Sequence, residues 1–144
     1  LFLSQAYYSV AFKGRKLMPA VFVADERGPL EPNVYMAFSS GRPDIDADLF
    51  LPHEVEGFLE SIWRRFGQMP TEKLMTMSKE TMAFKRAKKR GNRAEIDFAD
   101  MQLSFIRAEK TPGVDQVVKP KIYRTQSGKP VTIKSWTPGA KSPN

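Results

Sequence analysis

The sequence predicts an α+β fold, in which an antiparallel sheet of about four strands is packed by one amphipathic helix at about residues 53–66. Runs of aromatic and β-branched residues alternate with turn sequences before residue 52, and one later stretch has full helical periodicity. We expect a basic strand–loop–strand segment after the helix. Residues 1–110 then form a single α+β domain, and residues 111–144 form a basic hairpin and an extended C-terminal tail.

Four short segments are predicted as strands. They are bounded by residues typical of turns, such as the runs at residues 13–16 and 25–29. Pro19 has no N–H to donate to a ladder, which places the second segment at a sheet edge or at the start of a strand. The predicted strands are residues 6–12, 17–24, 33–39 and 48–51.

An apolar stripe predicts the helix at about residues 53–66. Its members follow the spacing i, i+3, i+4, i+7, i+8 and i+11, which places them on one helical face. Pro52 suits the first helical turn, while Gly67 and Pro70 suit the end of the helix. The stripe consists of Val55, Phe58, Leu59, Ile62, Trp63 and Phe66.

The region after this helix has two interpretations. The composition of residues 71–90 favours a second helix. Over residues 82–87, however, Met82, Phe84 and Arg86 alternate with Ala83, Lys85 and Ala87, which suits a strand. We favour two strands with the basic run 88–93 as the loop between them. The second strand rests on Ile96 and Phe98, followed in the opposite phase by Met101, Leu103 and Phe105, and the phase change at residues 99–100 indicates a bulge or a tight turn.

The C-terminal segment is basic and contains a predicted hairpin. Residues 121–124 and 131–134 are β-prone, and they flank the turn sequence 127–130. From Gln116 to the end there are 6 basic residues and no acidic one. This composition is typical of a segment that becomes ordered against a partner.

The composition excludes several kinds of chemistry. The 144 residues include no cysteine and 1 histidine, which rules out disulfides, thiolate metal sites and sites with two imidazoles. No apolar run reaches the ~20 residues of a membrane span. The lack of cysteine is compatible with a reducing intracellular compartment or an organelle matrix. Leu1 in place of Met is compatible with a removed organellar presequence, such as a mitochondrial one, or with a trimmed chain.

Residues that support catalysis or metal binding in other proteins form no complete pattern. Asp44, Asp46 and Asp48 begin like a calcium loop, but the glycine and glutamate required at its sixth and twelfth positions are missing. Glu95 and its acidic neighbours lack the lysine spacing of a nuclease, and His53 at the helix start has no positioned partner. Phosphate-binding glycine motifs are missing as well. We therefore expect no enzyme activity, no cofactor and no metal.

Net charge is unevenly distributed along the chain. Residues 1–62 hold 5 basic and 9 acidic groups, a net charge of −4, whereas residues 63–144 hold 18 and 7, a net charge of +11. Such asymmetry indicates a polyanionic partner, although a solvated basic face also arises for solubility alone. The strongest cluster is expected to follow a sugar–phosphate backbone. It consists of Lys85, Arg86, Lys88, Lys89, Arg90 and Arg93, and Lys119, Lys121 and Arg124 are expected to support it.

Aromatic side chains beside cations are candidates for stacking on unpaired bases, which contributes about 1–3 kcal/mol per base. Tyr7, Tyr8 and Tyr123 are assigned to the nucleic-acid site for this reason, and Trp136 is a further candidate. Six other large aromatic residues are assigned to the core. They are Phe12, Phe22, Phe38, Phe58, Trp63 and Phe66.

These features predict a non-catalytic nucleic-acid-binding protein. RNA or single strands are preferred over duplex DNA, because the predicted helix is acidic outside and offers no base-reading face. One alternative is a structural subunit of a large ribonucleoprotein assembly, such as an organellar ribosome or an RNA-processing complex, in which the basic tail contacts RNA and neighbouring proteins. Another is a module that binds acidic proteins. No membrane partner is expected, since the helix carries glutamates on its polar face.

The element order has one parallel. Four strands followed by a helix, over about the first 70 residues, is similar to the repeat unit of the Whirly and PUR-type single-strand binders. This similarity implies that nucleic acid would lie on the sheet.

Overall fold

The chain is mainly helical. The computed structural model describes residues 1–44, 51–106, 112–118, 123–124 and 126–131. The predicted α+β fold is wrong, because the strands of this part form only two separate two-stranded antiparallel sheets. The similarity to the Whirly and PUR-type repeats is lost with it.

The helices are α1 (Phe2–Ala11), α2 (Pro32–Ala37), α3 (His53–Phe66), α4 (Thr71–Lys79), α5 (Met82–Arg90), α6 (Phe98–Ile106) and α7 (Val114–Val117). The strands are β1 (Val23–Asp25), β2 (Gly28–Leu30), β3 (Tyr123–Arg124) and β4 (Pro130–Val131).

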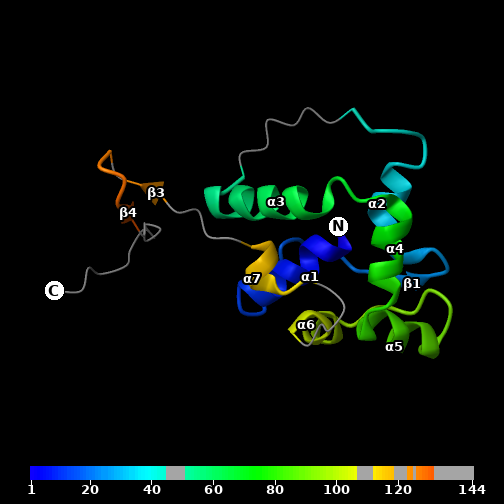
Figure 1. Ribbon diagram of the computed structural model, residues 1–144. Helices are drawn as coiled ribbons and strands as arrows, with labels where there is room; N and C mark the ends of the chain where they lie inside the picture. The colour runs from blue at the N-terminus through cyan, green and yellow to red at the C-terminus, as the bar shows by residue number, and fades with distance from the viewer. Residues whose placement is uncertain (45–50, 107–111, 119–122, 125, 132–144) are drawn as a thin grey trace, which may run out of the picture.

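Helix α1 lies at the centre of the fold, between α3 and α6 (Figure 1). The strand predicted at residues 6–12 is wrong, because this apolar segment is helical. The Tyr7 ring lies 5.5 Å from the Phe66 ring of α3 and 4.9 Å from the Phe105 ring of α6, measured between centroids. A helix that is buried nearly all round has no polar face, so composition and periodicity do not distinguish it from a buried strand.

A small sheet follows α1. Strands β1 and β2 form a hairpin, and residues 93–96 lie along the other edge of β1. There the N–H of Ala24 donates to the carbonyl of Ala94 over 2.9 Å. The strand predicted at residues 17–24 is therefore confirmed only in its last two residues.

Residues 33–39, predicted as a strand, belong mostly to the short helix α2. The Glu31 carboxylate caps this helix by accepting a hydrogen bond from the N–H of Val34, and Pro32 occupies the first helical turn. These local signals override the strand-like alternation. The predicted strand at residues 48–51 lies outside the described residues except for Leu51, which is not in a strand.

The helix predicted at about residues 53–66 is confirmed as α3. It buries Phe58, Ile62 and Phe66 of the predicted stripe. At the end of α3 the backbone of Gly67 lies close to Trp63, and an added Cβ would lie 2.6 Å from the Trp63 carbonyl oxygen. Only glycine fits this position without a shift of the backbone.

Residues 71–90 form two helices, α4 and α5, which confirms the helical interpretation; the favoured strand–loop–strand segment is wrong. Thr81 begins α5, because its Oγ1 accepts a hydrogen bond from the N–H of Phe84. Most of the second predicted strand is helix α6, in which Met101 and Phe105 are buried one helical turn apart, and only its first residue, Ile96, lies along the edge of the β1–β2 hairpin. Their spacing of four fits a helix as well as it fits alternation.

The chain after α6 adds one helix and one hairpin. Helix α7 packs against α1 and α3, and its Val117 joins the core. Strand β3 pairs with β4, which confirms the predicted hairpin as far as it is described. The domain boundary at residue 110 stays a prediction. No described helix is long and apolar enough to cross a membrane.

Candidate nucleic-acid interface

Helix α5 presents the basic cluster. Its buried face consists of Ala83, Phe84 and Ala87, which fixes the orientation of the other residues. The cations at positions 85, 86 and 88–90 are all exposed, and the helix contains no acidic residue. Its C-terminal turn also stabilises the helix, because cations there oppose the negative end of the helix dipole.

Three arginines of the cluster are held by the fold. Arg86 pairs with Asp100 of α6. Arg90 Nη2 donates to the Glu95 carbonyl over 2.6 Å, and Arg93 Nε donates to Asp25 Oδ2 over 2.9 Å. These side chains therefore connect α5 and the following turn to α6 and β1.

The lysines of the cluster are held less firmly. Lys88 Nζ donates to the neutral side chain of Asn92 over 3.2 Å, so its charge is not compensated. Lys85 and Lys89 lie one turn apart, opposite the buried face, and in the described part of the chain neither makes a hydrogen bond or ion pair. We call Lys85, Lys88 and Lys89 the basic face. It is the part of the predicted cluster that is open to a ligand.

The turn after α5 has an unusual backbone. Gly91 has a φ of 148° and Arg93 a φ of 55°. Glycine adopts such an angle freely, whereas other residues are strained there. The pKa of the Asp25 carboxyl is lowered, mainly by the hydrogen bond that the Arg93 side chain donates to it. The backbone N–H of Arg27, which also donates to Asp25, is the second cause.

The predicted stacking tyrosines do not join this surface. Tyr7 and Tyr8 are buried in the core, and the Tyr7 hydroxyl donates to the Pro112 carbonyl over 2.8 Å. Stacking on a base requires an exposed ring, so the structure removes both from the interface. The structure does not describe the side chains of the other predicted site residues. These are Tyr123, Lys119, Lys121, Arg124 and Trp136.

The candidates for metal binding and catalysis gain no support. Among the described residues, no group of three histidine, aspartate or glutamate side chains is placed to hold a metal ion. His53 is largely exposed and lies 3.7 Å from the Glu56 carboxylate, on the surface of α3. Asp44 is exposed, and Asp46 and Asp48 lie outside the described residues.

Two aromatic residues assigned to the core are on the surface instead. Phe22, Phe58 and Phe66 are buried as predicted, and Phe12 packs against the core, but Phe38 and Trp63 are exposed. The sequence contains a signal for the exposure of Trp63. This residue lies at the edge of the apolar stripe, and it follows Glu56 by seven residues, nearly two helical turns, which places it on the same side of the helix as that charged residue.

Comparison of the chain with protein-family models, with curated proteins and with solved structures finds no match.

Proposed function

We propose that the protein binds nucleic acid without catalysis, through contacts of the basic face with the phosphate backbone. The observation that carries this proposal is the arrangement on α5: three lysines point away from the core, and no carboxylate of the described residues neutralises them. Ammonium groups spaced along one helix face fit successive phosphates.

The proposal concerns the backbone that RNA, single-stranded DNA and duplexes share. Base stacking by Tyr7 and Tyr8 is not part of it, because both rings are buried. The preference for unpaired strands therefore depends on residues beyond the described part. The cations that reach a phosphate lie on a helix, which is the element that also fits the grooves of duplexes.

Fluorescence anisotropy with a labelled 20-nucleotide RNA, the matching DNA strand and its duplex, over a range of salt concentrations, tests the proposal. In the test variant Lys85, Lys88 and Lys89 are changed to Gln. Each lost phosphate contact lowers the slope of log K against log salt by about 0.9 on duplex and about 0.7 on single strands. We expect the slope to fall by roughly 2 to 3 and the affinity near 0.1 M salt to fall by about fivefold to eightfold per contact.

A matched control removes the same charge elsewhere. Arg64, Arg65 and Lys73 are exposed cations of α3 and α4, and changing them to Gln also lowers the net charge by three. The control is expected to keep most of the affinity and the slope. Equal losses in the two variants would mean that only net charge attracts the nucleic acid, and the basic face would not be a site.

A further inference from the structure

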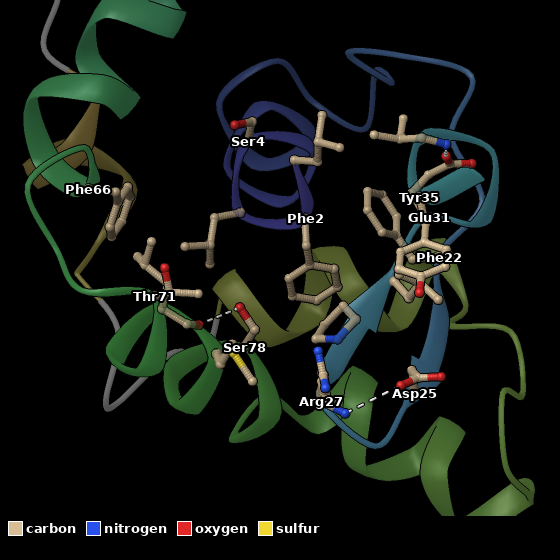
Figure 2. Close-up of a pocket in the computed structure, with 18 of the residues that line it drawn as sticks. Phe2, Ser4, Phe22, Asp25, Arg27, Glu31, Tyr35, Phe66, Thr71 and Ser78 are labelled. Atoms are coloured by element: carbon tan, nitrogen blue, oxygen red, sulfur yellow. Dashed lines mark hydrogen bonds between the residues drawn. The ribbon is translucent and has the colours of Figure 1, made fainter. Parts of the chain in front are cut away.

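A second surface lies away from the basic face. A groove of about 1170 Å³ runs between α2 and the C-terminal half of α3, beside the β1–β2 hairpin. Figure 2 shows Phe66 and Tyr35 on opposite sides of it, with Phe2 of α1 between them and Asp25 and Arg27 at the hairpin. We call this hollow the apolar groove. A smaller hollow of about 510 Å³ shares Trp63 with it and extends along α3.

The apolar groove exposes side chains that a folded chain normally buries. Tyr35 is 61% exposed, Phe38 is 49% exposed and Trp63 is 71% exposed. Helix α2 buries none of its residues. A helix of this length is not stable by itself in water and normally depends on packing against another element, so its apolar side chains are available for such packing. Contiguous exposed apolar side chains, with Trp and Tyr among them, are typical of surfaces that bind another protein.

The shape of the groove favours a helix as its occupant. Its volume exceeds the roughly 300–1,000 Å³ of small-molecule pockets, and its walls are helices, as in the binding of an amphipathic helix in a groove. Addition of a strand to the nearby edge of β2 is disfavoured, because this strand has three residues and its central Pro29 has no N–H to donate.

The charges along the groove favour an acidic occupant. Its two carboxylates are already engaged: Asp25 pairs with Arg93, and Glu31 caps α2. Arg27 also lines the groove, and in the described part of the chain its guanidinium makes no ion pair or hydrogen bond. A carboxylate of the incoming helix would pair with the Arg27 guanidinium.

We propose that the apolar groove binds an amphipathic, acidic α-helix of another protein. Trp63 and Tyr35 contact the apolar face of that helix, and Arg27 pairs with a carboxylate near one of its ends. This site is separate from the basic face and does not depend on nucleic-acid binding.

A displayed library of 16-residue amphipathic helical peptides tests the proposal. The apolar face varies among large apolar residues, and the polar face varies among Glu, Gln and Lys. Peptides enriched on the wild-type protein are expected to carry apolar residues at i, i+3 or i+4, and i+7, with an excess of Glu at one end. Their affinities are then measured by calorimetry on purified variants.

Variants at exposed positions identify the site. Tyr35→Ser together with Trp63→Ser is expected to weaken the enriched peptides by about tenfold or more, and Arg27→Gln is expected to remove the preference for Glu. The matched control is Leu103→Ser with Ile106→Ser, which changes two exposed apolar residues of α6 outside the groove and should leave binding unchanged. Far-UV circular dichroism confirms that each variant folds.

Three results would overturn the proposal. The first is a lack of enrichment above a library of scrambled peptides. The second is unchanged binding to the folded variants of Tyr35 and Trp63, whether changed together or singly. The third is a wild-type dimer in light scattering that these variants convert to a monomer, which would assign the groove to a second copy of the chain.

Discussion

Replacing Gln5 by methionine is expected to destabilise the protein by about 3 kcal/mol. Gln5 is fully buried in α1, and its side-chain amide holds the loop that follows this helix. Oε1 accepts hydrogen bonds from the N–H of Leu17 (3.0 Å) and of Met18 (3.1 Å), while Nε2 donates to the Met18 carbonyl (3.1 Å). Methionine has a similar length, but it leaves these three backbone groups without their partner.

The magnitude follows from the burial of those groups. A buried polar group that loses its partner destabilises the fold by about 1–3 kcal/mol. Leu17 and Met18 are only half-buried, so water replaces part of the loss and the lower end of that range applies. Three groups at about 1 kcal/mol each give about 3 kcal/mol. This is a large fraction of the roughly 5–15 kcal/mol that stabilises a typical domain.

Urea unfolding followed by far-UV circular dichroism measures the free energy of unfolding. Gln102→Met is the matched control, because the Gln102 side chain makes one hydrogen bond within the described part of the chain, from Nε2 to the Ser9 carbonyl (3.1 Å). We expect a loss of about 1 kcal/mol for the control. If Gln5→Met is no more destabilising than Gln102→Met, the three hydrogen bonds of Gln5 do not hold the loop and the reasoning is refuted.

Two further predictions concern the elements around the basic face. Thr81→Ala removes the cap of α5 and is expected to lower the free energy of unfolding in urea by about 1 kcal/mol, while nucleic-acid affinity under native conditions stays the same; a drop in affinity would contradict this. Asp25 has a lowered pKa in the folded protein, so its pairing with Arg93 contributes stability above the ordinary carboxyl value of 3.8 and loses it as pH falls through the folded pKa. Asp25→Asn should therefore be less stable than wild type at neutral pH, and urea unfolding between pH 2 and 7 should show the difference vanishing on the acidic side.

Helix α3 was predictable from the sequence because its environment is simple. One face packs on the core and the other faces water, so the apolar residues keep a clear period of 3.6. Helix α1 lacks that contrast. Its neighbours α3, α6 and α7 cover most of its surface. Side chains on different sides of the helix, such as Phe2, Tyr7 and Tyr8, are therefore all buried. The same residues therefore matched a strand by composition.

The candidate site was predicted in part, for a similar reason. A cluster of cations is visible in any sequence, and the cations at positions 85, 86 and 88–90 are indeed exposed on one element. Which cations are available for a ligand depends on partners far along the chain, such as Asp25, which lies 68 residues from Arg93. The exposure of Phe38 was not predicted either, because it depends on how α2 is placed in the fold, whereas the position of Trp63 at the edge of the apolar stripe was a signal that the prediction did not use.

A short piece of backbone, the turn after α5, connects the helix that carries the basic face to the apolar groove. Arg93 follows α5 and lines the groove, its N–H donates to the Ala24 carbonyl of β1, and its side chain pairs with Asp25. A substitution that loosens this connection would weaken both surfaces and would assign a function to neither. The lysines of the basic face, and Tyr35 and Trp63 of the groove, are exposed side chains outside the connection, so changing one set tests one surface. If the lysine variant also lost the helical peptide, or the aromatic variant the nucleic acid, β1 would have to transmit the effect, and the two surfaces would be one coupled site.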